Sequence, residues 1–447
     1  MTSPVSRPLG WWLVYNFLLL PLLLTAVWVM ARLKGGKLRE GLQGRQGVWK
    51  RLEAALSGRD ETQPLVWFHV ASAGEFLQAQ PVLERCLAGG AQAVVTVSSP
   101  SGLRWAERRR GTLRGLLAVD YLPVDLPWHA GRLLALIRPT VLVYVRSDLW
   151  PNLVWSAATT GVPQVLICAA LPERSARFRM PIVRSLYATL YRCMTLIGAV
   201  APEDQARFLS QLPGHEGVEV LGDTRYDSAL ERKATVRTPQ LPKWVQGGRV
   251  LVVGSSWPQD EAVTLPVLRE AMDRYQDMVL IFAPHEIHEP HIKSLKMAFA
   301  GWRPVAYTSL NSLREGSDPS RMLLVDTVGV LASLYRYGTV AYVGGGFSSG
   351  VHNVMEPAVM GLPVIFGPRY HNSPEAMELL QAGGARSVRD SKGLGAVLFP
   401  WLDAPAKARE AGGVASAFVQ ARAGAASACA EKIQMIWKQG DPGTSAP

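Results

Sequence analysis

The chain alternates short, apolar, β-branched runs with stretches of helical character along most of its length. The predicted strands form two series, which are 65–71, 93–97, 141–145, 164–168 and 195–200, then 250–253, 278–282, 323–325, 339–343 and 363–366. Near-continuous apolar runs indicate parallel strands that are buried on both faces. Their alternation with helices predicts an α/β protein with two Rossmann-like, doubly wound domains, and we expect these to face each other across a cleft.

A polar segment at 231–248, with Pro239, Pro242 and a pair of glycines, separates the two series and is the best candidate for a linker. The sequence therefore predicts an N-terminal domain over 32–228 and a C-terminal domain over 229–447. A chain of 447 residues is long enough for two such domains and one additional segment.

The additional segment is an uncharged run of 23 residues from Leu9 to Ala31, long enough to cross ~30 Å of hydrocarbon. Cations follow it directly, at Arg32, Lys34, Lys37, Arg39, Arg45, Lys50 and Arg51. By the positive-inside rule, the domains then lie in the cytoplasm. A cleaved signal peptide is the alternative, but the run is long and the cations follow it rather than precede it. We expect residues 1–31 to form an uncleaved anchor, which Asn16 and Pro21 leave open to be tilted, kinked or partly interfacial.

The formal charge of +11 suggests a polyanionic partner, but its distribution narrows the choice. Residues 1–51 carry eight Lys and Arg against one acid, a net of +7. Cations beside an apolar helix favour anionic lipid headgroups, so a membrane is the expected partner and nucleic acid is not. The four cysteines have no paired or metal-like spacing, and we expect buried free thiols in a reducing compartment.

Ligands of doubly wound domains bind beyond the carboxyl ends of the strands, so the loops there are the candidate sites. After the first strand comes Ser72-Ala73-Gly74-Glu75, where Glu75 could act as a general base or simply as an acid favoured by a helix start. After 141–145 comes a loop from Arg146 to Asn152, where Asp148 could position a substrate or belong to an ordinary turn.

The second series carries two small-residue loops. Gly254-Ser255-Ser256 is a weak phosphate-loop signal. Gly344-Gly345-Gly346 continues through Gly350 and His352 to Asn353 and Glu356, a pattern typical of a nucleotide site in which the acid holds a ribose diol. A capping box between Asn353 and Glu356 is the alternative.

A third loop of the second series, from Pro284 to His291, holds three histidines and two glutamates. Its spacing is not that of a zinc helix, and Pro290 interrupts helical presentation of the side chains. We expect His285, nearest the strand end, to contact a ligand, and we expect no metal site.

Taken together, these motifs resemble the transferases of 3-deoxy-D-manno-octulosonic acid (Kdo), from the anchor to about residue 390. The motifs that carry the resemblance are Gly41-Leu42 with Arg45, His69 to Glu75, Tyr121-Leu122-Pro123 with Asp125, Leu149 to Asn152, Gly222 to Asp227, Gly254 to Pro258 with Asp260-Glu261, Asp326 to Gly329, and Gly344 to Pro368. A generic glycosyltransferase would share only the last of these blocks.

The resemblance implies a GT-B fold and an inverting, metal-independent glycosyltransferase without a cofactor. It implies CMP-Kdo as donor and the glucosamine 6-hydroxyl of a lipid A precursor (lipid IVA) as acceptor, at the cytoplasmic face of a bacterial inner membrane with anionic lipids. Glu75 matches the proton acceptor of the family, and Asp148 and Arg225 match positions that support the transition state. Asp148 stands where many members have Glu, and Arg146 where some have an acid.

The resemblance also implies substrate contacts in both domains. The expected donor contacts are Ser255, Ser256, Pro284, His285, Val328, Gly329, Val330, Gly345, Gly346, Asn353, Val354, Met355 and Glu356. The expected acceptor contacts are Ser72, Gly74, Ser101, Gly102 and Asn152.

Two alternatives remain open from the sequence. One is another GT-B enzyme that uses a nucleotide sugar on a lipid acceptor, and protection by CMP but not UDP would distinguish the two. The other is a non-catalytic, membrane-tethered binder of nucleotides or lipids, which an intact Glu75 disfavours only weakly.

Overall fold

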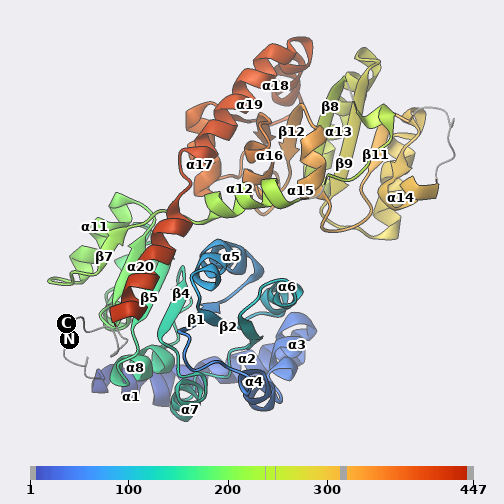
Figure 1. The fold of residues 1–447 in the computed structure, drawn as a ribbon. Coiled ribbons are helices and arrows are strands. Elements are labelled where there is room, and N and C mark those ends of the chain that lie inside the picture. Colours follow the sequence, from blue (N-terminus) through green and yellow to red (C-terminus); the bar gives the residue numbers. More distant parts are fainter. Residues whose placement is uncertain (1–6, 237, 247, 313–319, 440–447) are drawn as a thin grey trace. The chain divides into compact units, whose positions relative to one another are not determined.

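The computed structural model describes residues 7–236, 238–246, 248–312 and 320–439, which form two compact units (Figure 1). The first unit holds the chain up to Ser228 together with the segment from Ala423 onward, and the second holds Ala229–Arg422. Each unit is built on a parallel sheet of seven strands. Two doubly wound α/β domains, as the sequence predicts, are therefore confirmed.

The sheet of the first unit has the order β3-β2-β1-β4-β5-β6-β7. Its strands are β1 (Leu65–Val70), β2 (Gln92–Val97), β3 (Leu116–Tyr121), β4 (Val141–Val145), β5 (Gln164–Ala169), β6 (Leu196–Ala199) and β7 (Val218–Val220). Its helices are α1 (Leu9–Val14), the π-helical turn η1 (Tyr15–Leu19), α2 (Leu20–Lys34), α3 (Gly36–Gly44), α4 (Val48–Leu56), α5 (Ala73–Ala88), α6 (Pro100–Arg110), α7 (Pro127–Ile137), α8 (Pro151–Thr159), α9 (Ala176–Arg179), α10 (Pro181–Tyr191), α11 (Pro202–Gln211) and α20 (Ala425–Gln439).

The sheet of the second unit has the order β10-β11-β9-β8-β12-β13-β14. Its strands are β8 (Arg249–Ser256), β9 (Met278–Pro284), β10 (Val305–Ala306), β11 (Met322–Leu324), β12 (Val340–Val343), β13 (Val364–Phe366) and β14 (Ala385–Ser387). Its helices are α13 (Pro258–Arg274), α14 (Glu289–Ala298), α15 (Leu331–Leu334), α16 (Met355–Val359), α17 (Pro374–Ala382), α18 (Ser391–Asp403) and α19 (Pro405–Gln420), with short 3-10 turns at η2 (Lys243–Val245), η3 (Ala300–Trp302), η4 (Tyr307–Ser312) and η5 (Tyr335–Tyr337). Helix α12 (Arg225–Thr235) contains the boundary between the units.

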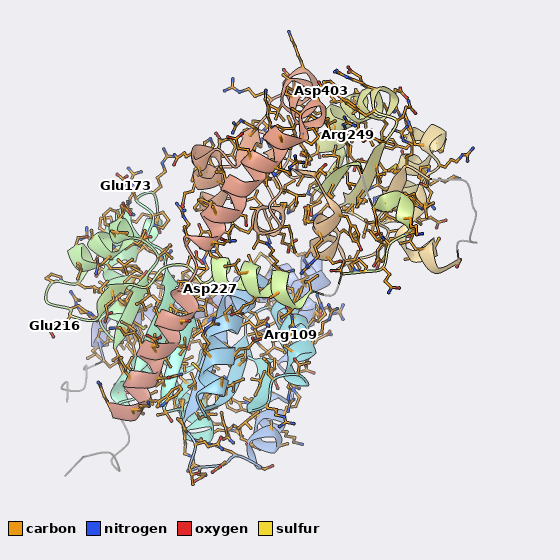
Figure 2. All side chains as sticks on the ribbon, turned by 45° about the horizontal axis from the view of Figure 1, so that its top comes forward. Arg109, Glu173, Glu216, Asp227, Arg249 and Asp403 are labelled. Carbon is orange, nitrogen blue, oxygen red and sulfur yellow. The ribbon has the colours of Figure 1, made fainter. Side chains whose placement is uncertain are left out.

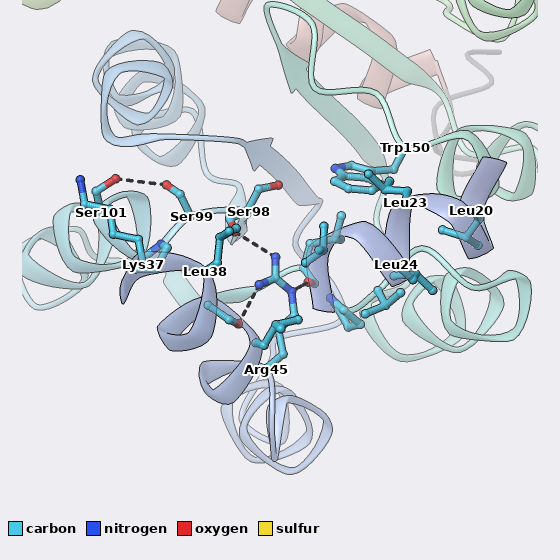
Figure 3. Close-up of a pocket in the computed structure, with 17 residues that line it drawn as sticks. Leu20, Leu23, Leu24, Lys37, Leu38, Arg45, Ser98, Ser99, Ser101 and Trp150 are labelled. Carbon is cyan, nitrogen blue, oxygen red and sulfur yellow. Dashed lines mark hydrogen bonds between the residues drawn. The ribbon is translucent and has the colours of Figure 1, made fainter. Parts of the chain in front are cut away.

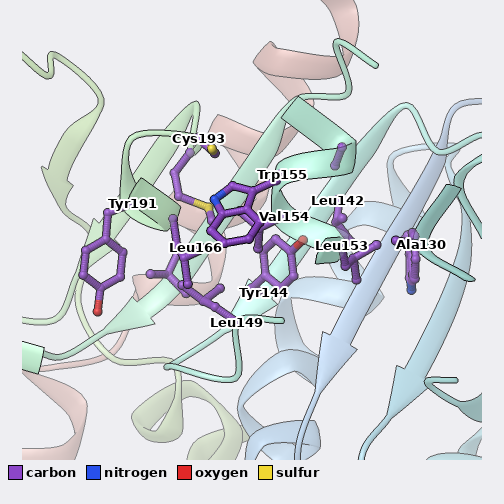
Figure 4. Close-up of a cluster of buried hydrophobic side chains, with 14 of the residues drawn as sticks. Ala130, Leu142, Tyr144, Leu149, Leu153, Val154, Trp155, Leu166, Tyr191 and Cys193 are labelled. Atoms are coloured by element: carbon purple, nitrogen blue, oxygen red, sulfur yellow. The ribbon is translucent and has the colours of Figure 1, made fainter. Parts of the chain in front are cut away.

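Both faces of each sheet are buried, because successive side chains of one strand enter different cores. In β1, Trp67 packs into a cluster with Tyr144 and Trp155, whereas Phe68 packs into a second cluster with Phe76. Figure 4 shows the first of these clusters between β4, β5 and α8. Side chains of this size, fully removed from water, supply most of the free energy that holds the layers together.

The predicted linker is wrong, because part of the segment belongs to the core of the second unit. Leu241 and Val245 are buried there, and Val245 lies in the 3-10 turn η2. The chain passes from one unit to the other within helix α12, at the predicted boundary between residues 228 and 229 and before the two prolines.

The expected assignment of the whole C-terminus to the second domain is also wrong. Helix α20 returns to the first unit and packs on α5, where Ala426, Cys429 and Ile433 enter the core (Figure 1). Asp227 accepts a hydrogen bond from the backbone N–H of Gly424 at 2.9 Å, which joins the start of α12 to the segment before α20 (Figure 2). The sequence of an amphipathic helix predicts that one of its faces is buried, but not which of two sheets buries it.

The apolar N-terminal run is helical, and Leu9–Leu33 is long and apolar enough to cross a membrane by length and composition. The π-helical turn η1 lies directly before Pro21, whose ring removes a backbone donor from the helix. All four cysteines are buried and free, as predicted.

We predict that Ile433→Ala destabilises the first unit by about 2–4 kcal/mol, because its fully buried side chain fills the core between α20 and α5. Met435→Ala is the control, since Met435 lies on the same helix with 55% of its surface exposed. Urea unfolding followed by hydrogen exchange of the α5 amides measures the effect. Equal stability of the two variants would show that α20 does not hold this unit together.

Candidate active site

Glu75 lies in the first turn of α5, directly beyond the end of β1. The side chain of Ser72 caps the helix and accepts a hydrogen bond from the Glu75 N–H at 3.4 Å. The Glu75 carboxylate turns back and accepts a hydrogen bond from the Ala71 N–H at 2.5 Å. A serine followed three residues later by a glutamate at a helix start therefore fixes the position of this acid.

The pKa of Glu75 is raised, chiefly by burial. The Ala71 N–H lowers this pKa, the charge of Asp148 raises it, and His69 and Arg146 lower it. Glu75 therefore lies within electrostatic reach of side chains beyond the ends of β1 and β4.

Asp148 is held by two side chains from neighbouring strand ends. Its Oδ2 lies 3.0 Å from Nε2 of His69 and accepts a hydrogen bond from the Ser98 hydroxyl at 2.7 Å. Burial raises the pKa of Asp148, but the hydrogen bonds and charge of its neighbours outweigh burial, and the net shift is downward. Asp148 is therefore an ionised neighbour beside a more basic Glu75.

An ionised Asp148 can only accept, so Nε2 of His69 carries the proton in their contact, while Nδ1 faces Thr96. The Thr96 hydroxyl accepts a hydrogen bond from Nε1 of Trp67 at 2.9 Å and lies 2.9 Å from Nδ1 of His69. Both contacts are satisfied when the threonine proton goes to Nδ1, and Nε2–H then donates to Asp148. His69 is fully buried, so it orients Asp148 rather than contacting a substrate.

The structure brings four of the five expected acceptor contacts together. Ser72 and Gly74 lie at the start of α5, and Ser101 and Gly102 lie at the start of α6. A Cβ at Gly102 would lie 3.3 Å from the carbonyl carbon of Ser72, so the two helix starts are in close contact. Glycine at this position lets the two loops approach each other.

The fifth expected acceptor contact, Asn152, is placed differently and is a correction. Its side chain is 1% exposed, and its amide exchanges hydrogen bonds with the amide of Asn16 at 3.0 and 2.8 Å. It also donates to the backbone oxygen of Asp125. Asn152 therefore holds the N-terminal helix and has no surface left for an acceptor.

Arg225 begins α12 and is paired with Asp223 at 2.8 Å. Asp223 also accepts a hydrogen bond from Gln78, which lies one turn beyond Glu75 on α5. The guanidinium is 18% exposed. Arg225 is thus held beside the helix that carries Glu75.

In the second unit, the glycine-rich loop after β12 is organised by one buried carboxylate. Asp260 is fully buried and accepts four hydrogen bonds, which come from the backbone N–H groups of Trp257, Gly345 and Phe347 and from the hydroxyl of Tyr342. Gly345 has a φ of +90°, and a Cβ there would overlap the Gly350 carbonyl oxygen. The loop therefore requires glycine for its shape and Asp260 for its position.

Three flat rings lie in a stack beyond β8 and β9. The ring of His285 stacks on both Trp257 and His352, with ring centres 4.3 and 4.5 Å away, while those two rings are nearly parallel with their centres 6.3 Å apart. Nε1 of Trp257 donates to Nε2 of His352 at 2.8 Å. Burial and the neighbouring His285 lower the pKa of His352, which is consistent with a neutral ring that accepts this bond. The sequence motifs contain each of the three rings, but they do not predict that the rings stack on one another.

Glu356 lies at the start of α16 and forms an ion pair with Arg232 at 3.0 Å. Burial raises the pKa of Glu356, and Arg232 lowers it. The Asn353 side chain accepts from the N–H of Met355, and Val354 rather than Asn353 precedes the helix. The capping box is therefore absent, since Glu356 is paired with Arg232.

The remaining residues expected to contact the donor differ in their exposure to solvent. Ser255 has a φ of +55°, a strained conformation at the strand end, and the hydroxyl of Ser256 is bound to Glu261 at 3.0 Å. The buried residues are Gly345, Gly346, Pro284, Val354 and Met355, whereas His285, Val328 and Gly329 are exposed. Val330 is partly buried just before α15, and Gly329 has a φ of +88°. Buried positions can offer a ligand only their backbone.

Comparisons with known proteins show what the chain is similar to. Residues 42–228 match the family described as 3-Deoxy-D-manno-octulosonic-acid transferase (kdotransferase). The chain is 28% identical over 427 residues to the 3-deoxy-D-manno-octulosonic acid transferase of Bordetella pertussis, covering 91% of this chain and 94% of that protein. It is 28% identical over 355 residues to the transferase of Chlamydophila psittaci, covering 77% and 78%. The chain therefore carries a Kdo transferase family domain and resembles several curated Kdo transferases over most of its length.

These matches identify the chain as a glycosyltransferase, as the sequence resemblance implies. Its fold is also that of UDP-GlcNAc 2-epimerase from Neisseria meningitidis, with a TM-score of 0.58 at 13% identity, covering 84% of this chain and all of that one. At this identity the likeness shows the GT-B-type fold alone.

Proposed function

We propose that this protein is a Kdo transferase that moves Kdo from CMP-Kdo to the glucosamine 6-hydroxyl of a lipid A precursor, with inversion and without a metal ion or cofactor. The observation that carries the proposal is the placement of Glu75, a half-buried carboxylate of raised pKa at the end of a strand. The anionic partner is the inner membrane, which the apolar helix Leu9–Leu33 and the cations after it would bind from the cytoplasmic face.

The proposed chemistry is a single displacement. Glu75 removes the proton of the acceptor hydroxyl as its oxygen attacks the anomeric carbon of Kdo, and CMP departs from the opposite face with the bonding electrons. A raised pKa makes Glu75 a stronger base, and its backbone hydrogen bond fixes the direction of approach. One base and no covalent intermediate give inversion.

Asp148 and Arg225 have supporting roles in this scheme. Asp148 is occupied by His69 and Ser98, so it acts by its charge, which keeps Glu75 basic. Arg225 supplies a cation for the negative charge that develops in the transition state. The donor contacts of the second unit, among them His285, Asn353 and Glu356, would hold CMP-Kdo.

We predict that Glu75→Gln abolishes transfer while CMP still binds, because the amide keeps the shape of the carboxylate but accepts no proton. Mass spectrometry of a tetraacylated lipid A precursor incubated with CMP-Kdo counts the added sugars, and calorimetry measures CMP binding. The control is Glu84→Gln on the same helix, whose carboxylate contacts only Gln80 among the hydrogen bonds described. Turnover of Glu75→Gln at the wild-type rate would refute the role of Glu75.

We predict that Asp148→Asn shifts the acidic limb of the kcat/KM profile to lower pH. The base must be ionised, so activity rises with pH through the pKa of Glu75, and the charge of Asp148 raises that pKa. Loss of the charge lowers the pKa and moves the limb downward. Asp60→Asn, at an exposed turn, should leave the limb in place. A limb that stays or moves upward in Asp148→Asn would contradict the electrostatic role.

We predict that Glu356→Ala weakens CMP binding by about 1–3 kcal/mol, the range for a hydrogen bond to a charged group. Calorimetry with CMP and with UDP measures this effect and also tests the nucleotide. Glu378→Ala is the control, since Glu378 forms an exposed pair with Arg422. Unchanged CMP affinity with lowered thermal stability would mean that Glu356 serves only its pair with Arg232.

A further inference from the structure

A cavity of about 340 Å³ lies in the first unit beneath the N-terminal helix (Figure 3). Its residues come from α2, α3, the loop before α6, the segment after β3, and Trp150. The volume lies within the ~300–1,000 Å³ of small-molecule sites. All of the residues that line the cavity belong to the first unit.

The walls of the cavity are apolar. Helix α2 contributes Leu20, Leu23, Leu24 and Val27, and α3 contributes Leu38 and Leu42. The polar lining residues are Lys37, Arg45 and the serines at 98, 99 and 101. A cavity with leucine walls and a few polar groups at one side suits a ligand with an aliphatic chain and a polar head.

Arg45 stabilises the wall of the cavity and does not reach across the cavity to bind a ligand. Its guanidinium donates to the backbone oxygens of Gly41 at 2.7 Å, Leu122 at 2.9 Å and Ser98 at 2.9 Å (Figure 3). Lys37 is exposed, so it is the cation that an anionic head group at the rim would meet.

The polar side of the cavity adjoins the candidate active site. Ser98 lines the cavity and donates to Asp148 at 2.7 Å. Ser99 caps α6, whose Gly102 packs against Ser72 at the start of α5. When the polar end of a ligand lies at this side of the cavity, a single side chain separates it from the groups around Glu75.

The N-terminal helix is fixed in place above the cavity. Tyr15 donates to the buried Asp125 at 3.0 Å, and Asn16 is paired with Asn152. Other side chains of the same helix are exposed, with Phe17 at 73% and Leu22 at 60%. One helix thus presents leucines both to the cavity and to the surroundings, where its length and composition suit lipid.

We propose that this cavity takes one acyl chain of the lipid acceptor. The proposal rests on the proposed function for the identity of the acceptor. The acyl chain passes from the bilayer along α2, and its sugar head lies at the polar side beside Asp148. The N-terminal helix is then a wall of the acceptor site as well as a membrane-binding element.

The test fills the cavity from two walls, with Leu24→Trp on α2 and Leu38→Trp on α3. The control is Leu22→Trp, on the same helix as Leu24 but outside the cavity. The measurement is the ratio of kcat/KM for the tetraacylated precursor to that for its fully deacylated form. We expect this ratio to fall about tenfold or more in both filling variants, since each buried methylene contributes roughly fourfold in affinity. The control should keep the wild-type ratio.

Binding of dansyl undecanoic acid, followed by its fluorescence, separates failure of this proposal from failure of the proposed function. Wild type and Leu22→Trp should bind the probe, and the filling variants should not. If the probe binds in this pattern but no lipid A precursor is glycosylated, the acyl site stands and the proposed acceptor is wrong. If transfer proceeds but neither the ratio nor probe binding changes in both filling variants, the acyl site is refuted and the proposed function stands.

Discussion

One buried imidazole joins three adjacent strands at the candidate active site. His69 on β1 lies opposite Thr96 on β2 and opposite Tyr144 on β4, and its two nitrogens contact Thr96 and Asp148. A sheet covered on both faces leaves only the strand ends for polar chemistry, so a polar residue inside a strand must find its partner in the sheet. His69 finds both partners there and positions Asp148, whose charge adds to the effect of burial in raising the pKa of Glu75.

Buried carboxylates position the loops in both units. Asp125 accepts from the N–H groups of Asn152 and Leu153, and burial raises its pKa to about 6. Asp260 likewise accepts three N–H groups around the glycine-rich loop. A carboxylate that several backbone donors share costs less to bury than a lone one, and it fixes loops that no regular ladder reaches. Asp125 and Asp260, which the sequence presents only as parts of motifs, thus support the loops from inside the fold.

The ten predicted strands are present, and the four that the sequence did not reveal all lie at sheet edges. These are β3, β7, β10 and β14. Central strands are apolar along their whole length because both faces are covered, whereas edge strands can be short and mixed. Strand β10 has only two residues, and β14 includes Arg386. Periodicity has little to detect in β7, β10 and β14, whereas β3, with six mostly buried residues, is not explained in this way.

The candidate site was predictable as loops but not as contacts. Strand ends locate Glu75, Asp148 and the glycines, because chain order alone places them. The pairing of His69 with Asp148 depends on which strands are neighbours. The stack of Trp257 with His285 and His352 likewise joins three distant segments. For the pairing of His69 with Asp148, the available sequence signal was a single histidine inside a buried strand.

Asn16 has a structural role that its local sequence does not reveal. In a run of 23 uncharged residues an asparagine lowers the case for an anchor, since an unpaired amide in hydrocarbon costs several kcal/mol. Here the amide of Asn152 satisfies it, and Tyr15 is satisfied by Asp125 in the same way. The polar residues that weaken the helix as a membrane span therefore attach it to the first unit. That attachment places the leucines of α2 over the cavity. The polar residues Tyr15 and Asn16 therefore make the apolar residues of the same helix part of the site.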